Sequence, residues 1–175
     1  MSTAVKFIIS SLALFGCFFA QATDLKVGDI APNFKLQATT GDYYQLSDFK
    51  NKQAVVLAWY PRANTNGCTI ECKSLVEKGH LIRKYDVSYV MASVDPIDKN
   101  RDFAKKTSAD FPMLSDPTKE AAKAYDVLNI MRMASRVTFY ISKSGEILKI
   151  DEDISPKTAA EDIAKSLAEL GVSHK

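Results

Sequence analysis

The chain has 175 residues and a formal net charge of +2, and 46% of its residues are hydrophobic while 25% are charged. This length fits one domain with a sizeable core, and this composition is typical of an ordered globular protein. The nearly balanced charge excludes strong electrostatic attraction to nucleic acid or to an anionic membrane, so we expect neither as a partner.

The N-terminus has the pattern of a secretory signal peptide. One lysine precedes an apolar run over residues 7–20, and the small-x-small sequence that ends at Ala22 follows it. The run is short for a membrane span. We therefore predict a signal peptide over residues 1–22, an exported domain over 23–175 without stable membrane association, and a bacterial periplasm or similar space as its location. An uncleaved anchor and a lipoprotein attached through Cys17 are the alternatives.

The first half of the exported domain predicts three strands and a long helix. Residues 31–49 read as two short strands around a Thr-Gly-Asp turn. Residues 53–60 are a continuous apolar run that ends at a proline, which is typical of a central strand buried on both faces. A helix capped by Thr65 or Asn66 should then run to about Tyr85.

The second half continues this alternation of strands and helices. The expected elements are a buried strand over 87–95, a helix over 98–107, a short strand over 111–116, a short helix that begins at a capping Thr118, and a hairpin over 136–151 with its turn at 143–145. The last helix should have Ser155 as its cap, Pro156 at its first position and Gly171 as its end.

This order of elements predicts an α/β fold with a central mixed β-sheet flanked by helices. A central strand that ends in a cysteine-bearing loop and leads into a long helix is the thioredoxin-like arrangement. Ligands usually bind where strands end and helices begin at the carboxyl edge of such a sheet, so the cysteine-bearing loop is the expected site. Fold alone does not determine function.

Cys68 falls in the first turn of the predicted long helix. Unpaired backbone N–H groups and the helix dipole favour a thiolate at this position. Thr65 lies three residues earlier and can aim its hydroxyl at the sulfur or at a bound oxygen, and Pro61 can shield the thiol from bulk water. On these residues alone, a small inert cysteine buried at a helix start is an equal alternative.

The spacing Pro61-x-x-x-Thr65-x-x-Cys68 is similar to the P-x-x-x-T/S-x-x-C signature of the peroxiredoxin family. The resemblance extends over nearly the whole exported domain: "VGDIAPNFKL" looks like the family's opening and "GCTIE" like its active-site turn. "RVTFYISKSGEI" resembles the segment R-x-T-F-x-I-x-x-x-G-x-I, which places the family's essential arginine at Arg136. The short gap between cysteines is most similar to the bacterioferritin-comigratory-protein, or peroxiredoxin Q, type.

This resemblance implies a thiol-dependent peroxidase with a thioredoxin-like fold and no metal, haem or flavin cofactor. Cys68 would be the peroxidatic nucleophile, which attacks a hydroperoxide and becomes a sulfenic acid. Arg136, the Thr65 hydroxyl and backbone N–H groups near Gly67 would stabilise the negative charge on the leaving oxygen. Gly67 and Tyr60 would line the substrate pocket.

The position of Cys72 differs from the pattern of the peroxiredoxin Q type. In that subgroup the resolving cysteine usually follows the peroxidatic one by five residues, whereas Cys72 follows Cys68 by four. Side chains four apart on a helix have Cβ atoms about 5–6 Å apart, whereas a disulfide requires about 3.8 Å. The helix must therefore unwind locally to form a Cys68–Cys72 disulfide. In the alternative, an external thiol resolves the sulfenic acid. We expect a thioredoxin-like protein or a small thiol as the reductant.

A copper-binding module of the Sco type is the rival function, because C-x-x-x-C in an exported thioredoxin-like domain also resembles those chaperones. Soft thiolates suit Cu(I). That function requires a histidine near the start of the helix, and the chain offers only His80 and His174. We interpret both histidines as surface residues and predict no metal site. A disulfide oxidoreductase would need C-x-x-C, which the sequence does not contain.

Overall fold

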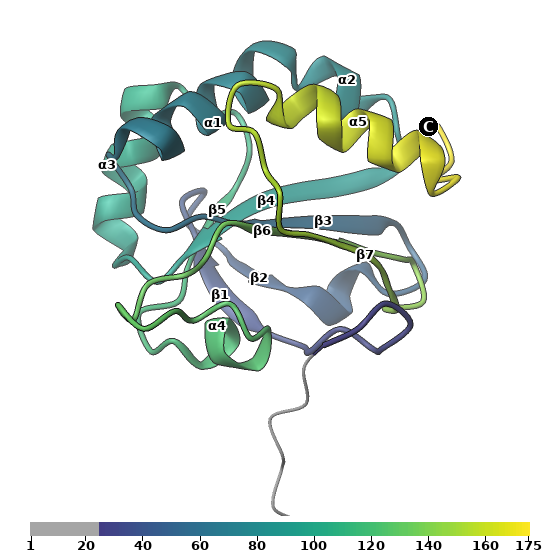
Figure 1. Ribbon diagram of the computed structural model, residues 1–175, viewed down its shortest axis with the longest axis horizontal. Helices are drawn as coiled ribbons and strands as arrows, with labels where there is room; N and C mark the ends of the chain where they lie inside the picture. The colour runs from purple at the N-terminus through teal and green to yellow at the C-terminus, as the bar shows by residue number, and fades with distance from the viewer. Residues whose placement is uncertain (1–24) are drawn as a thin grey trace, which may run out of the picture.

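The computed structural model describes residues 25–175, which form an α/β fold around one mixed seven-stranded sheet (Figure 1). The predicted signal peptide lies outside the described residues. In the sheet order β2-β1-β5-β4-β3-β6-β7, the pairs β3–β4 and β4–β5 are parallel and the other pairs are antiparallel. The strands are β1 (Lys35–Ala38), β2 (Tyr43–Gln45), β3 (Ala54–Trp59), β4 (Val87–Ser93), β5 (Met113–Ser115), β6 (Val137–Ile141) and β7 (Ile147–Asp151).

Helices cover both faces of this sheet. Figure 1 shows α1, α2 and α5 along one face and α4 on the other. Among residues 25–175, no helix is long and apolar enough to cross a membrane. The helices are η1 (Leu46–Phe49), α1 (Asn66–Lys78), α2 (His80–Arg83), α3 (Ile97–Thr107), α4 (Glu120–Ala124) and α5 (Ala159–Glu169). This architecture confirms the predicted mixed-sheet α/β fold.

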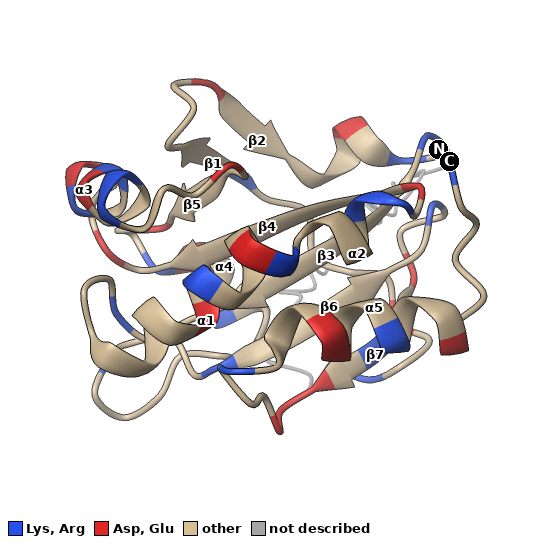
Figure 2. Ribbon diagram, turned by 90° about the horizontal axis from the view of Figure 1, so that it is seen from above, with Lys and Arg blue, Asp and Glu red and all other residues tan. Residues whose placement is uncertain are grey.

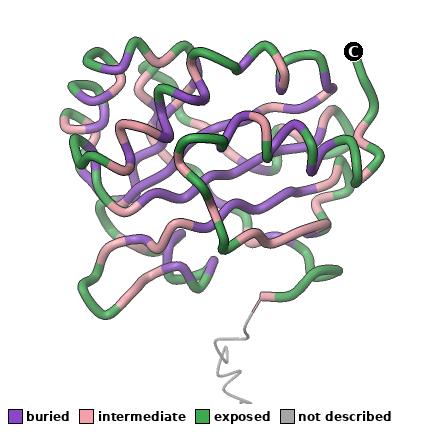
Figure 3. The backbone as a smooth tube through the Cα atoms, turned by 45° about the horizontal axis from the view of Figure 1, so that its top comes forward, coloured by how far each residue is buried: buried purple, intermediate pink, exposed green. Residues whose placement is uncertain are grey.

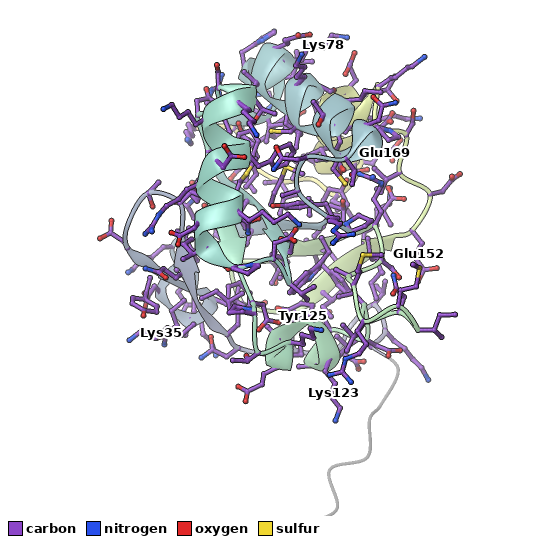
Figure 4. The ribbon with its side chains drawn as sticks, turned by 90° about the vertical axis from the view of Figure 1, so that its left-hand side faces the viewer. Lys35, Lys78, Lys123, Tyr125, Glu152 and Glu169 are labelled. Atoms are coloured by element: carbon purple, nitrogen blue, oxygen red, sulfur yellow. The ribbon has the colours of Figure 1, made fainter. Side chains whose placement is uncertain are left out.

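The central strand β3 is buried along its whole length, as its continuous apolar run predicts. Two apolar layers meet at the sheet, and its strands lie among buried residues in Figure 3. One layer holds Cys68 and Cys72 of α1. The other holds Trp59 and Tyr125. In Figure 4, Tyr125 lies between α4 and the sheet, whereas Lys123 extends away from it.

The helix expected to run from residue 66 to about 85 is interrupted at Gly79, which separates α1 from α2. Glycine weakens a helix interior. A Cβ at this glycine would lie 2.5 Å from the carbonyl oxygen of Leu75 and 2.9 Å from the Tyr89 hydroxyl. The chain therefore packs against β4 at a point where a side chain has no room.

The last helix begins three residues later than predicted. Residues 155–158 form a turn in which the Thr158 N–H donates to the Ser155 carbonyl at 3.1 Å, and α5 starts at Ala159. The Ala160 N–H then donates to the hydroxyl of Ser74 on α1 at 3.3 Å. Packing against α1 therefore decides where α5 begins, rather than the proline at the predicted first position.

The predicted cap of the short helix α4 is also wrong. Thr118 precedes the helix, which begins at Glu120, and its hydroxyl donates to the Asp116 carboxylate at 3.1 Å. The other oxygen of Asp116 accepts the N–H of Ala122 at 2.8 Å. This buried carboxylate, two residues before the predicted cap, therefore satisfies the free N–H group of the first turn.

We predict that Gly79→Ala lowers the free energy of unfolding by about 1–3 kcal/mol, because the new methyl group clashes with backbone and buried side-chain atoms. Urea unfolding followed by the fluorescence of Trp59, the single tryptophan, measures this change. Glu77→Ala, at an exposed position of α1, is the control and should change stability by less than about 0.5 kcal/mol. Equal stability of the two variants would contradict the tight packing at Gly79.

Candidate active site

The loop between β3 and α1 is held by a buried aspartate. The Ala63 N–H donates to the Asp95 carboxylate at 2.7 Å, and Lys99 pairs with the same side chain at 2.5 Å. Asn64 then adopts a left-handed conformation with φ of 64°, and Thr65 is the extended residue that precedes α1. These contacts determine where α1 begins and hence where Cys68 lies.

Cys68 is the third residue of α1 and only 1% of its surface is exposed. The Nη2 atom of Arg136 donates to its sulfur at 3.4 Å. Arg136 immediately precedes β6, and β6 pairs with β3 so that Val137 lies opposite Trp59. The antiparallel pairing of β3 and β6 thus brings a cation to a thiol that is distant in the sequence.

A buried carboxylate holds the other side of the same guanidinium. Glu71, which is 1% exposed, forms an ion pair with Nη1 of Arg136. Glu71 and Cys68 are three residues apart, and such side chains share one face of a helix. This role of Glu71 was not predicted from the sequence, although its three-residue spacing from Cys68 was an available signal. The guanidinium therefore bridges two side chains of α1.

Gly67 lies where this guanidinium approaches the start of α1. A Cβ at Gly67 would lie 3.3 Å from Nη2 of Arg136, which is a tight contact. The glycine therefore leaves room for the cation beside the free N–H groups of the first helical turn. The Arg136 guanidinium thus lies beside Cys68 at a helix start with free N–H groups, an arrangement that can hold an oxygen anion.

Cys72 lies one helical turn further along α1, and its side chain is fully buried. Its thiol donates to the hydroxyl of Thr107 on α3 at 3.2 Å. Burial raises the pKa of the Cys72 thiol to about 11, although the hydrogen bond with Thr107 lowers it. Both cysteines are free thiols in this structure. Their surroundings differ, since a cation contacts Cys68 and a neutral hydroxyl contacts Cys72.

The other expected site residues, Pro61, Thr65 and Tyr60, lie in three different surroundings. Pro61 is half-buried in the loop that leads from β3 to α1. The hydroxyl of Thr65 donates to the carbonyl of Arg62 at 2.9 Å rather than pointing at the sulfur. Tyr60 is fully buried, and its hydroxyl donates to Asn100 at 2.8 Å. Tyr60 therefore packs in the buried core, in the same cluster as Cys68.

The histidines considered for a copper site lie away from Cys68. His80 is exposed on α2, and His174 packs edge-on against Tyr85 with 4.6 Å between ring centroids. Within residues 25–175, no three His, Cys, Asp or Glu side chains are arranged to hold a metal ion.

Comparison with known proteins identifies the family. Residues 27–150 match the model of the AhpC/TSA family. The chain belongs to this family. It is 31% identical over 136 residues to peroxiredoxin Bcp of Escherichia coli, a match that covers 74% of this chain and 86% of that protein. It is 27% identical over 153 residues to peroxiredoxin Bcp of Bacillus subtilis. That match covers 83% of this chain and 97% of the Bacillus protein. The chain is thus a peroxiredoxin, an enzyme of the peroxidase class.

Solved structures agree with this assignment. Peroxidoxin BcpB from Mycobacterium tuberculosis superposes with a TM-score of 0.75 at 29% identity, over 83% of this chain and 97% of that one. The PrxQ C47S mutant from Xylella fastidiosa superposes with a TM-score of 0.75 at 23% identity, over 85% of this chain and 99% of that one. At this identity the likeness supports the fold alone. The thioredoxin-like fold and the suspected family are confirmed.

We predict that Glu71→Gln lowers the free energy of unfolding by about 3 kcal/mol, because a broken buried ion pair leaves the Arg136 charge without its carboxylate. The variant should also react more slowly with peroxide, since the guanidinium loses its anchor. Urea unfolding and peroxide consumption measure the two effects. Glu77→Gln makes the same chemical change at an exposed position of α1 and should alter neither. Equal behaviour of the two variants would argue against a structural role of the ion pair.

Proposed function

We propose that this peroxiredoxin reduces hydrogen peroxide and organic hydroperoxides with Cys68 as the peroxidatic nucleophile. The observation that carries this proposal is the contact of 3.4 Å between Arg136 Nη2 and the buried sulfur at the start of α1. An always-protonated guanidinium favours the thiolate, which is the reactive form of cysteine. The relatives named peroxiredoxin Bcp support the same chemistry.

In the first step, the Cys68 thiolate attacks the nearer oxygen of the hydroperoxide. A sulfur–oxygen bond forms and the O–O bond breaks, so the sulfur is oxidised to a sulfenic acid and the far oxygen leaves as water or an alcohol after it takes up a proton. The leaving oxygen carries growing negative charge. Arg136, which contacts the sulfur, and the free N–H groups near Gly67 and Cys68 at the start of α1 would stabilise it.

Cys72 is the proposed resolving cysteine. Its thiol would attack the sulfenic sulfur, form the Cys68–Cys72 disulfide and release the oxygen as water. The two residues are one turn apart on α1, so the helix start must unwind to close the bond. Thr65 forms no side-chain cap with the helix, which leaves the first turn without one common stabilising contact. The cycle uses thiols alone and no metal, haem or flavin.

The proposed location is an exported space, on the evidence of the signal-peptide pattern in residues 1–22. Cytosolic thioredoxin does not reach such a space. A thioredoxin-like partner supplied across the membrane, or a small thiol, would then reduce the disulfide.

Oxidation of the mature protein tests the catalytic cycle. Reduced protein treated with one equivalent of hydrogen peroxide should lose two hydrogens in intact mass and should no longer react with an alkylating reagent. Cys72→Ser should instead gain oxygen at Cys68 or form a mixed disulfide with added thiol, because the first step does not need Cys72.

Cys68→Ser is the control and should show neither change. Oxygen gain in the wild-type protein without a disulfide would mean that an external thiol resolves the sulfenic acid. An unchanged mass with both thiols still alkylatable would refute the peroxidase cycle.

Expression of the full chain in a Gram-negative host tests the location. The protein should appear in the periplasmic fraction with Thr23 as its first residue, because the small-x-small pattern ends at Ala22. A variant without residues 2–22 is the control and should stay in the cytosol. Full-length protein in the cytosolic fraction would contradict export, and with it the need for a reductant outside the cytosol.

A further inference from the structure

The two thiols of α1 contact different neighbouring elements. Cys68 contacts Arg136, which immediately precedes β6, whereas Cys72 donates to Thr107 at the end of α3. Helix α1 packs against α3 on one side and α5 on the other, and Figure 2 shows it between them. In the sheet, β6 lies on the far side of β3 from β4 and β5, which α3 connects. The sulfurs thus face different neighbours although they are one turn apart.

The hydroxyl of Thr107 both donates and accepts a hydrogen bond, and it accepts the one from the Cys72 thiol. Its own proton goes to the carbonyl of Phe103, one turn earlier on α3, at 2.8 Å. The oxygen therefore offers its lone pairs to the thiol proton of Cys72 at 3.2 Å. Thr107 and Cys72 are both buried, so water does not compete for this contact.

Disulfide formation requires this contact to break. The Cβ atoms of the two cysteines must approach to about 3.8 Å, and the sulfurs must turn toward each other. Unwinding of the first turn moves Cys68, but Cys72 lies inside α1 and stays turned toward α3 while Thr107 accepts its proton. Burial also keeps the Cys72 thiol protonated, since its pKa is raised to about 11. Unwinding at Cys68 must therefore be accompanied by release of Cys72 from Thr107.

We propose that Thr107 is a positioning residue for the resolving step, which holds Cys72 toward α3 and so limits the rate at which it attacks the sulfenic acid. This inference rests on the proposed function of Cys68 and Cys72. The step itself is the one given above: the sulfur–sulfur bond forms, the sulfur–oxygen bond of Cys68 breaks, and the Cys72 proton leaves with the oxygen as water. Thr107 exchanges no atoms or electrons and acts only through the side-chain orientation of Cys72.

The test compares Thr107→Val, which has nearly the same shape but no hydroxyl, with Thr107→Ser, which keeps the hydroxyl. Each protein is mixed with one equivalent of hydrogen peroxide, and samples are quenched with acid at successive times. The free thiols are then alkylated and the intact mass is measured. Loss of Cys68 alkylation reports the first step, and loss of two hydrogens reports the disulfide. In Thr107→Val, disulfide formation should be about two- to fivefold faster, because an S–H···O bond is weak. The first step should be unchanged.

Thr107→Ser should form the disulfide at the wild-type rate, which separates the hydrogen bond from the packing of the side chain. A disulfide rate in Thr107→Val that is unchanged or lower would overturn the proposal. Equal acceleration in Thr107→Val and Thr107→Ser would also overturn it, because packing would then be the cause. Thermal unfolding midpoints of all three proteins show whether a variant has lost its fold.

The same data distinguish this inference from the function on which it rests. If Cys68 gains oxygen but neither the wild-type protein nor Thr107→Val forms the disulfide, the positioning role is refuted and the peroxidase function stands. If Cys68 remains alkylatable in every protein, the peroxidase function itself fails. A disulfide that forms only in Thr107→Val would be the strongest form of the expected result.

Discussion

The antiparallel pairing of β3 and β6 is the constraint on which the site depends. β3 leads into the loop and helix that carry Cys68, and β6 begins directly after Arg136. Because Val137 lies opposite Trp59, the two strands bring the guanidinium to the start of α1. The arginine then satisfies a buried carboxylate and a buried thiol at once. A shift of this register by one residue would reverse the faces of the β6 side chains and separate the cation from the thiol.

Helix α1 gives its two cysteines unlike environments although they differ by one turn. At the first turn of the helix, with its free N–H groups, the Arg136 guanidinium contacts the Cys68 sulfur and also pairs with Glu71. Cys72 lies in the apolar layer between α1 and α3, where its polar neighbour is the uncharged Thr107. Both cysteines are buried, so the difference between them is the group that each sulfur contacts: the Arg136 guanidinium beside Cys68 and the Thr107 hydroxyl beside Cys72.

Periodicity and turn residues predicted most of the fold correctly. The continuous apolar run of β3 and the hairpin of β6 and β7 are where the sequence places them, since burial on both faces and a glycine turn leave local signatures. The errors lie at helix ends. Gly79 divides the long helix, and α5 begins at Ala159 rather than at the preceding proline. These boundaries depend on contacts with β4 and α1, distant segments that a local pattern does not describe.

The sequence by itself determined the family signature and the place of Cys68 in the first turn of a helix. It also indicated Arg136 as the arginine of the site. Motif spacing and helix signals are local, so they can be read without the fold. Only the tertiary structure decided that Glu71 anchors that arginine, that Tyr60 belongs to the core and that Cys72 faces Thr107. Side-chain direction depends on which elements pack on each side of a helix. The three-dimensional arrangement of α1, α3 and β6 therefore decides which of two neighbouring thiols meets a cation and which meets a hydroxyl.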